Sequence, residues 1–532
     1  MADFAWWQRG VIYQLYPRSF QDGDGDGVGD LAGIHQRLDY LAWLGVDAVW
    51  IPPIYPSPMA DFGYDITDHC AIDPLFGTLA EFDALLAEAH ERGLRVILDF
   101  VPNHTSDMHP WFQDALRGRD AAHRDWYLWA DPAADGGPPN NWRSHFGGPA
   151  WTLDPVTGQY YLHAFLKEQP DLNWRNPAVA RAMAQVMRFW LDRGVDGLRL
   201  DATWHLIKDE HLRNNPPDPS WHAGLPEHEK LAHVYTSDRP EVQRLVCELR
   251  QVVDEYPDRV LIGELYLPIE RVVAYYGTAG NGIHLPANAL LIGAPWDADS
   301  IGAAADRYEA LLPVFGWPNW ALGNHDKPRI AGRVPPGHSR LAALLLLTLR
   351  GTPTLYYGDE LGMCDGEIPP AAIRDPIERN MPGLGRGRDP QRTPMQWDDS
   401  PNAGFSPGQP WLPVAAGFEA LNVAGQRADD ASLLTLYRRL LQLRRAEPAL
   451  AVGRYAGQGA PPGILRYERE HDGRYLTVVL NFNETPRRIP GLQGRVLLST
   501  LGRDEGRDID DSLLLLPGEG AILTGRPGPA AG

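Results

Sequence analysis

The segment Gly194-Val-Asp-Gly-Leu-Arg-Leu-Asp-Ala-Thr-Trp-His205 is typical of a short strand that runs into a loop. Arg199 and Asp201 are two positions apart, so in a strand their side chains lie on the same face. A guanidinium beside a buried carboxylate lowers the pKa of that carboxylate, which suits a nucleophile better than a proton donor. The same spacing also fits a structural ion pair, and this segment alone does not decide between the two.

Short apolar segments of this kind alternate with amphipathic helical patterns over most of the chain. This order favours parallel strands covered by helices. Eight candidate strands favour a (β/α)8 barrel, the TIM barrel of the α/β class, over an open doubly wound sheet. The predicted strands are residues 11–16, 46–51, 95–100, 195–200, 259–263, 283–291, 319–322 and 352–357, and the predicted helices include 34–44, 79–92, 179–192, 240–255, 341–349 and 433–445.

Two changes of pattern predict the domain organisation. Residues 105–176 are rich in Trp, Pro, Gly and Asn and lack a helical period. Because so long a loop is uncommon in a compact domain, we interpret them as a small domain inserted after the third strand. Near residue 451 the pattern changes to period-two runs with turns, which predicts a C-terminal antiparallel β-sandwich domain over 451–532. The barrel then comprises residues 1–104 and 177–450.

Composition narrows the classes of partner. The 532 residues carry a formal net charge of −20, and no Lys/Arg run forms the basic patch that a nucleic-acid-binding protein needs. The three cysteines are far apart, so neither a disulfide framework nor a CxxC metal pair is expected. No signal peptide and no apolar run of about 20 residues are found, so we expect a cytoplasmic protein without a membrane segment.

Polar residues gather where the predicted strands end. The third strand runs into Asp99-Phe-Val-Pro-Asn-His104, the fourth ends at Asp201, the fifth at Glu264, and the seventh runs into Asn324-His-Asp326. In a parallel barrel these ends meet on one rim, where catalytic groups lie. The sequence therefore predicts three carboxylates and two histidines around one site.

The residue types on this rim favour glycoside chemistry. No Gly-x-Ser-x-Gly turn and no Gly-rich phosphate loop follows a strand. A metal-dependent hydrolase would also use His and Asp, but Arg199 in the same space opposes a divalent cation. Paired carboxylates can attack an anomeric carbon and protonate the leaving oxygen, and the abundant aromatic side chains suit contact with the apolar faces of sugars.

These segments resemble a known family. Asp99-Phe-Val-Pro-Asn-His104, Gly197-Leu-Arg-Leu-Asp201, Gly263-Glu264 and Asn324-His-Asp326 resemble the four signature regions of the α-amylase family, glycoside hydrolase family 13. Other segments are similar to its oligosaccharide-cleaving α-glucosidase branch, and the resemblance covers essentially the whole chain. They are Tyr13-Gln-Leu-Tyr-Pro-Arg-Ser-Phe20, Gly63-Tyr-Asp-Ile-Thr-Asp68, Gln169-Pro-Asp-Leu-Asn173 and Arg392-Thr-Pro-Met-Gln-Trp397.

The resemblance implies catalytic roles for three carboxylates. Asp201 is the expected nucleophile, and Glu264 is the general acid and then the general base. Asp326 is expected to hold the sugar 2- and 3-hydroxyls, and Arg199 to keep Asp201 ionised. No cofactor is expected to take part in the chemistry.

The resemblance also implies a set of substrate-binding residues. His104 and His325 would donate hydrogen bonds to the bound sugar, and Tyr64 would stack on the non-reducing glucose, with core packing as its alternative.

Asp61 and Arg392 would grip the terminal 4-hydroxyl, with Arg388 as the alternative arginine and a surface salt bridge as the alternative interpretation of the pair. Phe165 and Gln169 would line the aglycone entrance, with hydrophobic packing as the alternative for Phe165.

An acidic loop near the N-terminus predicts a structural metal. Asp22-Gly-Asp-Gly-Asp-Gly-Val-Gly-Asp30 matches the first nine positions of an EF-hand loop, but Gly33 stands where the bidentate Glu would be. Family members carry Ca²⁺ or Mg²⁺ at this loop. The predicted ligands are Asp22, Asp24, Asp26, the carbonyl of Val28, and Asp30, with an unoccupied Asp/Gly turn as the alternative.

The resulting functional hypothesis is a retaining exo-acting α-glucosidase that releases glucose from short α-glucosides, with transglycosylation as a possible second outcome. Ala202-Thr203 after the nucleophile resembles α-1,4 enzymes, whereas Val at the first of these positions resembles α-1,6 enzymes. Oligo-1,6-glucosidase, sucrose hydrolase or isomerase, and trehalose synthase remain alternatives, as does a non-catalytic binding homologue. The expected partner is a small oligosaccharide or disaccharide, and the protein would be a monomer or homo-oligomer.

Overall fold

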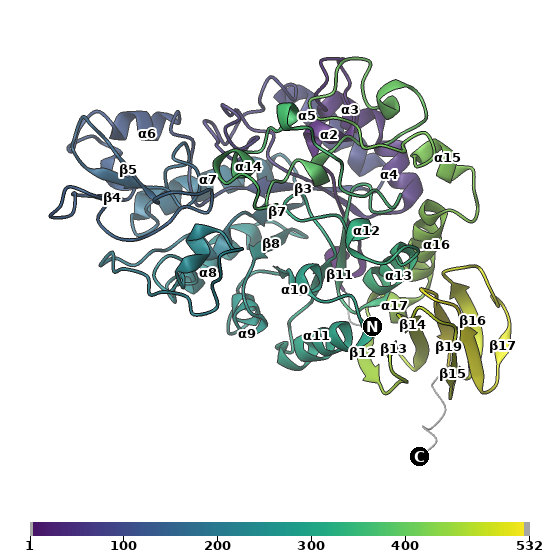
Figure 1. The fold of residues 1–532 in the computed structure, drawn as a ribbon. Helices are drawn as coiled ribbons and strands as arrows, with labels where there is room; N and C mark the ends of the chain where they lie inside the picture. The colour runs from purple at the N-terminus through teal and green to yellow at the C-terminus, as the bar shows by residue number, and fades with distance from the viewer. Residues whose placement is uncertain (1–3, 526–532) are drawn as a thin grey trace.

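The centre of the molecule is a closed barrel, seen in a computed structural model that describes residues 4–525 (Figure 1). All neighbouring strands are parallel, in the spatial order β1-β11-β10-β9-β8-β7-β3-β2. The predicted TIM barrel is therefore confirmed. Its strands are β1 (Ile12–Gln14), β2 (Ala48–Ile51), β3 (Arg95–Phe100), β7 (Gly197–Leu200), β8 (Val260–Leu265), β9 (Leu285–Asn288), β10 (Asn319–Ala321) and β11 (Thr352–Tyr356).

Helices surround this barrel, and their ends follow local sequence signals. Helix α7 (Pro177–Asp192) starts with proline at its first position, and the Asn176 side chain accepts a hydrogen bond from the Ala178 N–H. Within residues 4–525 no helix is both long and apolar enough to cross a membrane. The longer helices are α5 (Leu79–Glu91), α7, α8 (Val242–Asp254), α11 (Ala298–Leu311), α13 (Ser339–Thr348) and α16 (Leu433–Ala446).

The predicted helix over 34–44 is divided in two. Helix α3 (Leu31–Gln36) and helix α4 (Leu38–Leu44) meet at Arg37, whose φ of −107° and ψ of 6° break the helical path. Helix α3 begins at Asp30, which caps it by accepting from the Gly33 N–H. The remaining short helices are α1 (Trp6–Arg9), α2 (Pro17–Phe20), α6 (Pro110–Ala115), α9 (Ile269–Val272), α10 (Leu290–Gly293), α12 (Ile330–Arg333), α14 (Pro376–Asn380), α15 (Val423–Arg427) and α17 (Pro448–Ala451).

The segment between β3 and α7 forms a separate small sheet, as expected for an insertion. Strands β4 (Trp129–Ala130), β6 (Tyr160–Leu162) and β5 (Trp151–Leu153) pair antiparallel in that order. In Figure 1 this sheet projects from the barrel beside α6 and α7. It has its own buried core, made by Ala130, Trp142, Ala150, Trp151 and Leu162.

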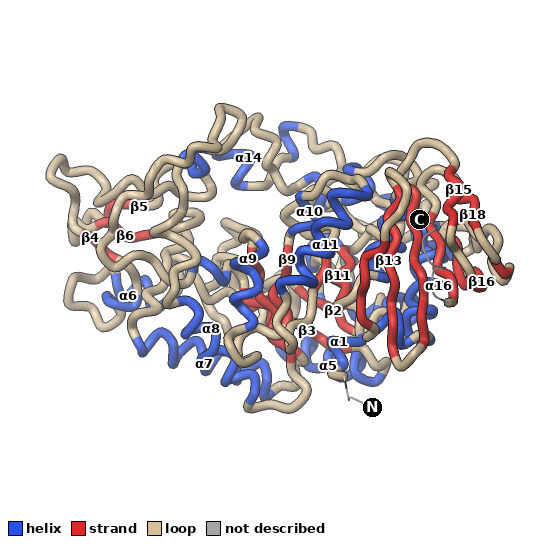
Figure 2. Tube along the Cα trace, turned by 90° about the horizontal axis from the view of Figure 1, so that it is seen from below, coloured by secondary structure: helices blue, strands red, loops and turns tan. Residues whose placement is uncertain are grey.

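The C-terminal part is antiparallel β structure that packs beside the barrel (Figure 2). A six-stranded sheet has the order β12-β13-β14-β19-β16-β17, and β15 and β18 form a two-stranded sheet. Apolar residues of both sheets share one core. The strands are β12 (Arg454–Gln458), β13 (Ile464–His471), β14 (Arg474–Asn481), β15 (Arg487–Pro490), β16 (Gly494–Ser499), β17 (Asp508–Ile509), β18 (Ser512–Leu515) and β19 (Gly520–Thr524).

Candidate active site

A cavity of about 420 Å³ lies at the carboxyl ends of the barrel strands. Most of the residues expected from the sequence meet there, on or after the strands β2, β3, β7, β8 and β10. Its lining includes Asp61, Tyr64, His104, Phe165, Asp201, Ala202, Glu264 and Asp326. The expected residues Gln169, Arg199, His325 and Arg392 are buried and contact members of this lining.

Arg199 is the centre of the carboxylate cluster. In the barrel register it lies directly opposite Asp99 of β3, and its Nη1 is 3.0 Å from Asp99 Oδ1. The same Nη1 is 2.7 Å from Asp201 Oδ1, and Nη2 is 2.9 Å from Glu264 Oε1. Parallel pairing of β3, β7 and β8 therefore brings three carboxyl groups from three strands onto one guanidinium.

The arrangement of three carboxyl groups around Arg199 affects their pKa values. Burial raises the pKa of Asp201 well above its ordinary value, and Glu264 and Asp99 raise it further against the lowering effect of Arg199. Burial also raises the pKa of Asp99 to about 6. The predicted contact is present and Arg199 lowers the pKa of Asp201 as expected, but burial and the two neighbouring carboxyls outweigh this effect. One guanidinium thus faces three buried carboxyl groups, and burial holds the pKa values of Asp99 and Asp201 above their ordinary range.

Glu264 is fixed from both sides. One carboxyl oxygen faces Arg199, and Oε2 accepts a hydrogen bond of 2.9 Å from the backbone N–H of Ala202. That N–H is aimed at Glu264 by a left-handed backbone conformation at Ala202, with φ of 45°. A non-glycine residue pays a steric penalty in this region, and such outliers are concentrated at functional sites.

Asp326 is held as an anion by two arginines. Arg392 Nη2 is 2.7 Å from Asp326 Oδ1, and Arg388 Nη1 is 3.4 Å from the same atom. Burial by itself raises the pKa of Asp326, but His325 and the two guanidiniums hold it well below its usual range. Two guanidiniums therefore face Asp326, although Arg388 also binds other carboxylates, whereas Arg199 alone faces three carboxyl groups.

The arginine that pairs with Asp61 is Arg388, which corrects the preferred sequence assignment. Arg388 Nη2 is 2.6 Å from Asp61 Oδ1 and also 2.6 Å from Asp375 Oδ1. Arg392 is fully buried and points to Asp326 instead. The two arginines are four residues apart, and a short 3₁₀ turn ends at the second of them. Either could pair with Asp61 on sequence grounds, and only their packing distinguishes them.

A hydrogen-bond chain connects Tyr64 to the cluster. Gln14 Nε2 donates to His325 Nδ1 over 2.7 Å, and His325 Nε2 donates to the Tyr64 hydroxyl over 2.8 Å. That hydroxyl in turn donates to Asp99 Oδ2 over 2.8 Å. Burial lowers the pKa of His325 to about 3, so the imidazole is neutral and has one N–H. Tyr64 stacks on His325 with parallel rings 5.6 Å apart while it also lines the cavity.

Gln169 does not reach the aglycone entrance, which corrects its expected position. Its side chain is fully buried, and Nε2 lies 3.2 Å from Asp61 Oδ2 and 3.1 Å from His104 Nε2. Phe165 does line the cavity, and its ring centre is 5.3 Å from that of His104. Burial lowers the pKa of His104 to about 4, so this imidazole is also neutral at pH 7.

Several lining residues were missed in the sequence. Tyr266 is two positions after Glu264, a spacing that could have placed both on one face of the strand. Its hydroxyl accepts a hydrogen bond of 2.8 Å from Asn324 Nδ2, and Trp204 packs against its ring at 5.6 Å. Sequence spacing gave no comparable signal for the other residues, which come from loops. They include His145, Phe146, His228, Glu229, Lys327, Met381 and Arg386.

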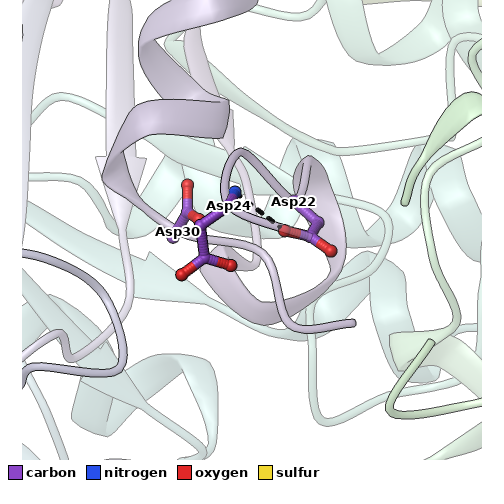
Figure 3. Close-up of side chains that lie close together, drawn as sticks. All are labelled: Asp22, Asp24 and Asp30. Carbon is purple, nitrogen blue, oxygen red and sulfur yellow. Dashed lines mark hydrogen bonds between the residues drawn. The ribbon is translucent and has the colours of Figure 1, made fainter. Parts of the chain in front are cut away.

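The acidic loop gathers three of its expected ligands (Figure 3). Carboxyl oxygens of Asp22, Asp24 and Asp30 all lie within 4.8 Å of one another and could hold a metal ion. Asp26 is outside this group, and its carboxylate accepts from the Val28 N–H over 2.7 Å. Oxygen-only donors suit a hard cation such as Ca²⁺ or Mg²⁺.

Comparison with known proteins agrees with this geometry. The catalytic-domain model of the alpha-amylase family matches residues 14–453. A probable alpha-glucosidase of Rhizobium meliloti (strain 1021) is 42% identical over 498 residues, covering 91% of this chain and 90% of the relative. An oligo-1,6-glucosidase of Halalkalibacterium halodurans is 36% identical over 563 residues, covering 98% and 99%.

A solved structure shows the same fold over nearly the whole chain. The crystal structure of the alpha-glucosyl transfer enzyme XgtA superposes with a TM-score of 0.93 at 40% identity, covering 98% of this chain and 100% of that one. The barrel, the three carboxylates at its rim and these similarities lead to one conclusion. The chain belongs to the α-amylase family of glycoside hydrolases, and within it to the α-glucosidase-type enzymes.

Proposed function

We propose that the protein is a retaining exo-acting α-glucosidase that prefers short α-1,4-glucosides. The observation that carries the exo assignment is the buried Asp61–Arg388 pair in the cavity wall. Arg388 also contacts Asp326, so a sugar bound by Asp326 meets fixed charges at its far end. A chain that continued beyond that sugar would have to displace a buried ion pair, which is strongly unfavourable.

Retention follows from the proximity of the two reacting carboxyls. Asp201 and Glu264 bind the two terminal nitrogens of one guanidinium, which favours the short separation of about 5–5.5 Å used by retaining enzymes. In this proposal Asp201 attacks the anomeric carbon while Glu264 gives its proton to the leaving oxygen. Glu264 then takes a proton from water, whose oxygen displaces Asp201 and restores the anomeric configuration.

Product analysis on maltose, isomaltose, sucrose and trehalose tests this proposal. We expect glucose from maltose at the highest kcat/KM, and α-glucose as the first anomer that NMR detects when an aryl α-glucoside is cleaved. β-Glucose as first product would contradict retention, and release of maltose from maltotetraose would contradict exo action at a single glucose.

Ala202 is the residue on which the linkage preference depends. It lines the cavity next to Asp201 and donates its N–H to Glu264. Because Val at this position resembles the α-1,6 enzymes, Ala202→Val is expected to raise the ratio of isomaltose to maltose kcat/KM by about tenfold, equivalent to about 1.4 kcal/mol. If isomaltose is already the better substrate of the wild-type enzyme, the protein is an oligo-1,6-glucosidase instead.

Transfer to a second sugar is a further outcome of the same covalent intermediate. Water and a sugar hydroxyl compete for the glucosyl group on Asp201, so a high sugar concentration favours transfer. The similarity to an enzyme described as transferring α-glucosyl groups supports this part of the proposal.

We also propose that the Asp22–Asp30 loop binds Ca²⁺, or Mg²⁺ in its place. The loop closes through hydrogen bonds from Gly25 and Gly27 to Asp22, so the carboxyls are arranged by the backbone rather than by chance. Each carboxylate has about four lone-pair sites, which leaves acceptors for a cation. The metal would neutralise the clustered charge and take no part in the reaction.

Calcium is therefore expected to raise the melting temperature after treatment with EDTA. Saturation at about 100 times Kd stabilises the folded state by about 2.7 kcal/mol, a shift of a few degrees in a chain of this size. Asp24→Asn should remove most of this shift, because Asp24 is exposed and belongs to the carboxyl group of three. Calorimetry with and without millimolar Ca²⁺ measures the shift in melting temperature for the wild-type protein and for the variant. An equal shift in the two proteins would contradict the proposed metal site.

A further inference from the structure

A second large cavity lies on the opposite face of the barrel from the carboxylate cluster. Its volume is about 860 Å³, against about 420 Å³ for the cavity that contains Asp201. The barrel residues in its lining come from the starts of strands, because Val11 precedes β1, Asp47 precedes β2 and Arg95 begins β3. The amino ends of the strands form the face remote from a TIM-barrel active site. We call this second space the basal cavity, and it is separate from the catalytic one.

Three helices and one strand end complete the walls of the basal cavity. Arg9 comes from α1, and Arg444 and Arg445 come from the last turn of α16. Pro448 belongs to α17, and His471 is the last residue of β13 in the C-terminal sheet. The basal cavity therefore lies at the junction of the barrel with the C-terminal part of the chain.

The lining of the basal cavity is basic, although the whole chain has a formal net charge of −20. Four arginines and two aspartates line it, which gives a formal excess of two positive charges when His471 is neutral. A basic cavity in an acidic protein favours an anionic ligand. The charged residues are Arg9, Arg95, Arg444, Arg445, Asp47 and Asp258.

Arg444 is a buried cation that is held by carbonyl groups. Its side chain belongs to a residue that is only 2% exposed, and Nη1 and Nη2 donate to four backbone carbonyls at the ends of α13 and α17. The Nε atom is buried and has no acceptor within residues 4–525. Burial lowers the pKa of Arg444 to about 10, although the charge of Asp47 acts in the opposite direction. The positive charge at Arg444 is therefore poorly compensated by the protein.

Arg469 of β13 is a second buried cation in the same region. It is fully buried, and its guanidinium donates to the carbonyls of Thr348 and Gly453. Burial and then the charge of Arg444 lower the pKa of Arg469 to about 9. Buried charges are unfavourable unless an opposite charge pairs with them. An anion in the basal cavity would supply that opposite charge.

The arginines nearer the surface have donors that remain available to a ligand. Arg445 uses Nη2 to bind Asp47 Oδ1 at 2.9 Å, and its side chain is 63% exposed. Arg95 uses Nη1 to bind Asp196 Oδ1 at 2.9 Å, and its side chain is 34% exposed. Each guanidinium has five N–H donors, so one ion pair does not exhaust it. Both arginines can therefore contact an anion without losing the partners that position them.

An aromatic ring lies beside these cations. The Arg95 guanidinium carbon is 4.9 Å from the centre of the Trp6 ring, and Trp6 Nε1 donates to the backbone oxygen of Asp258 over 2.9 Å. Trp6 and Phe4 both belong to the lining of the basal cavity. Aromatic rings of this kind contact the apolar faces of sugars. The cavity thus offers a cationic part and an aromatic part side by side.

We propose that the basal cavity binds a phosphate group, carried either by inorganic phosphate or by the phosphate ester of a sugar. A phosphate monoester has about two negative charges at pH 7, which match the excess of positive charge in the lining. Arg95 and Arg445 bind the phosphate oxygens, since guanidinium groups match phosphate geometry, and Arg444 adds its charge from the wall. The site lies away from the catalytic carboxylates, so the inference does not depend on the proposed α-glucosidase function.

Titration calorimetry of the full chain with inorganic phosphate and with glucose 6-phosphate tests this site. We expect one bound ligand per chain in both cases, with weaker binding at higher salt concentration. Glucose 6-phosphate should bind about tenfold more tightly, because its sugar ring adds a contact with Trp6. Equal affinities would identify inorganic phosphate, rather than a sugar phosphate, as the ligand.

Arg445→Glu tests the cationic part of the basal cavity. The variant removes a charge-assisted contact and adds a repelling carboxylate, so the affinity for inorganic phosphate should fall about ten- to hundredfold. The exposed position of Arg445 favours retention of the fold, which circular dichroism checks. Hydrolysis of an aryl α-glucoside by this variant should equal that of the wild-type enzyme, because the catalytic cavity is on the other face.

Arg244→Glu is the matched control. Arg244 lies on α8, its side chain is 79% exposed, and its partner is Glu248, four residues along the same helix and outside the basal cavity. This variant makes the same change of net charge as Arg445→Glu and should leave phosphate binding unchanged. Trp6→Ala separates the aromatic part, because it should remove the advantage of glucose 6-phosphate and keep the affinity for inorganic phosphate.

The outcomes separate this site from the catalytic one. No binding of either ligand at millimolar concentration would overturn the proposal. Binding that Arg445→Glu leaves unchanged, or binding that saturating glucose abolishes, would also overturn it, because the ligand would then occupy another site such as the catalytic cavity. Phosphate binding by a protein that cleaves no α-glucoside would refute the proposed function alone.

Discussion

Replacing Asp201 by asparagine is expected to reduce kcat by about 10⁴–10⁶-fold, the range seen when a catalytic nucleophile is removed. The amide cannot form the glucosyl ester, and residual binding by the other residues does not substitute for that bond. The hydrolysis of an aryl α-glucoside measures this loss. Activity close to that of the wild-type enzyme would refute the assignment of Asp201.

The same substitution is expected to raise the melting temperature. Asp201, Asp99 and Glu264 share one guanidinium, and burial raises the pKa of Asp201 because the charged form is unfavourable there. Asparagine has the same shape but carries no charge, so it leaves only two carboxyl groups to share the guanidinium of Arg199. Many active sites store strain of this kind, so loss of activity with gain of stability is the signature of a catalytic group.

Asp196→Asn is the matched control for this pair of effects. Asp196 directly precedes the same strand at its opposite end, and its carboxylate binds Arg95 at 2.9 Å and the Val96 N–H at 2.9 Å. Burial opposes its ionisation, but hydrogen bonds from His90 and Val96 lower the pKa of Asp196 below its usual value. This variant should lose about 1–3 kcal/mol of stability and keep its kcat, the reverse of Asp201→Asn.

Arg199→Leu is expected to have the largest effect on stability. It leaves Asp99, Asp201 and Glu264 without their shared cation in a buried site. Removing one partner from a buried ionic group destabilises a protein by about 3–5 kcal/mol. Activity should be lost as well, because the guanidinium positions both reacting carboxyls. Denaturant unfolding measures the stability, and a loss below about 1 kcal/mol would contradict the central role of Arg199.

The pH dependence of this variant has a defined sign. A carboxyl whose pKa is higher in the folded state binds protons more tightly when folded, so stability falls as the pH rises from its unfolded value through its folded value. In the wild-type protein the pKa of Asp99 is already raised to about 6 by burial, and loss of the cation raises it further. The difference in melting temperature between wild type and Arg199→Leu should therefore be smaller at pH 4.5 than at pH 7.5. An equal difference at both pH values would show that lost packing, not charge, destabilises the variant.

The catalytic carboxylates could be predicted because each is adjacent to a recognisable strand. Asp201 and Glu264 follow short apolar segments, and parallel pairing requires the carboxyl ends of such strands to meet. Helix breaks such as Arg37 and the choice between Arg388 and Arg392 were not predictable in this way. Both arginines lie four residues apart in the long segment after β11, and the partner of each depends on how that segment packs.

Local periodicity and the geometry of parallel strands were enough to predict the barrel, its two additional β regions and the carboxylates at its rim from the amino-acid sequence. The distribution of charge around these carboxylates, in contrast, depends on tertiary contacts. Arg199 is shared by three carboxyls, whereas Asp326 binds two guanidiniums, of which Arg388 also binds Asp61 and Asp375. Glu229 of the β7–α8 connection likewise lies 3.7 Å from Arg386 of the segment after β11. Such contacts join loops that are far apart in the chain, and burial and distance, which set their strength, exist only in the folded molecule.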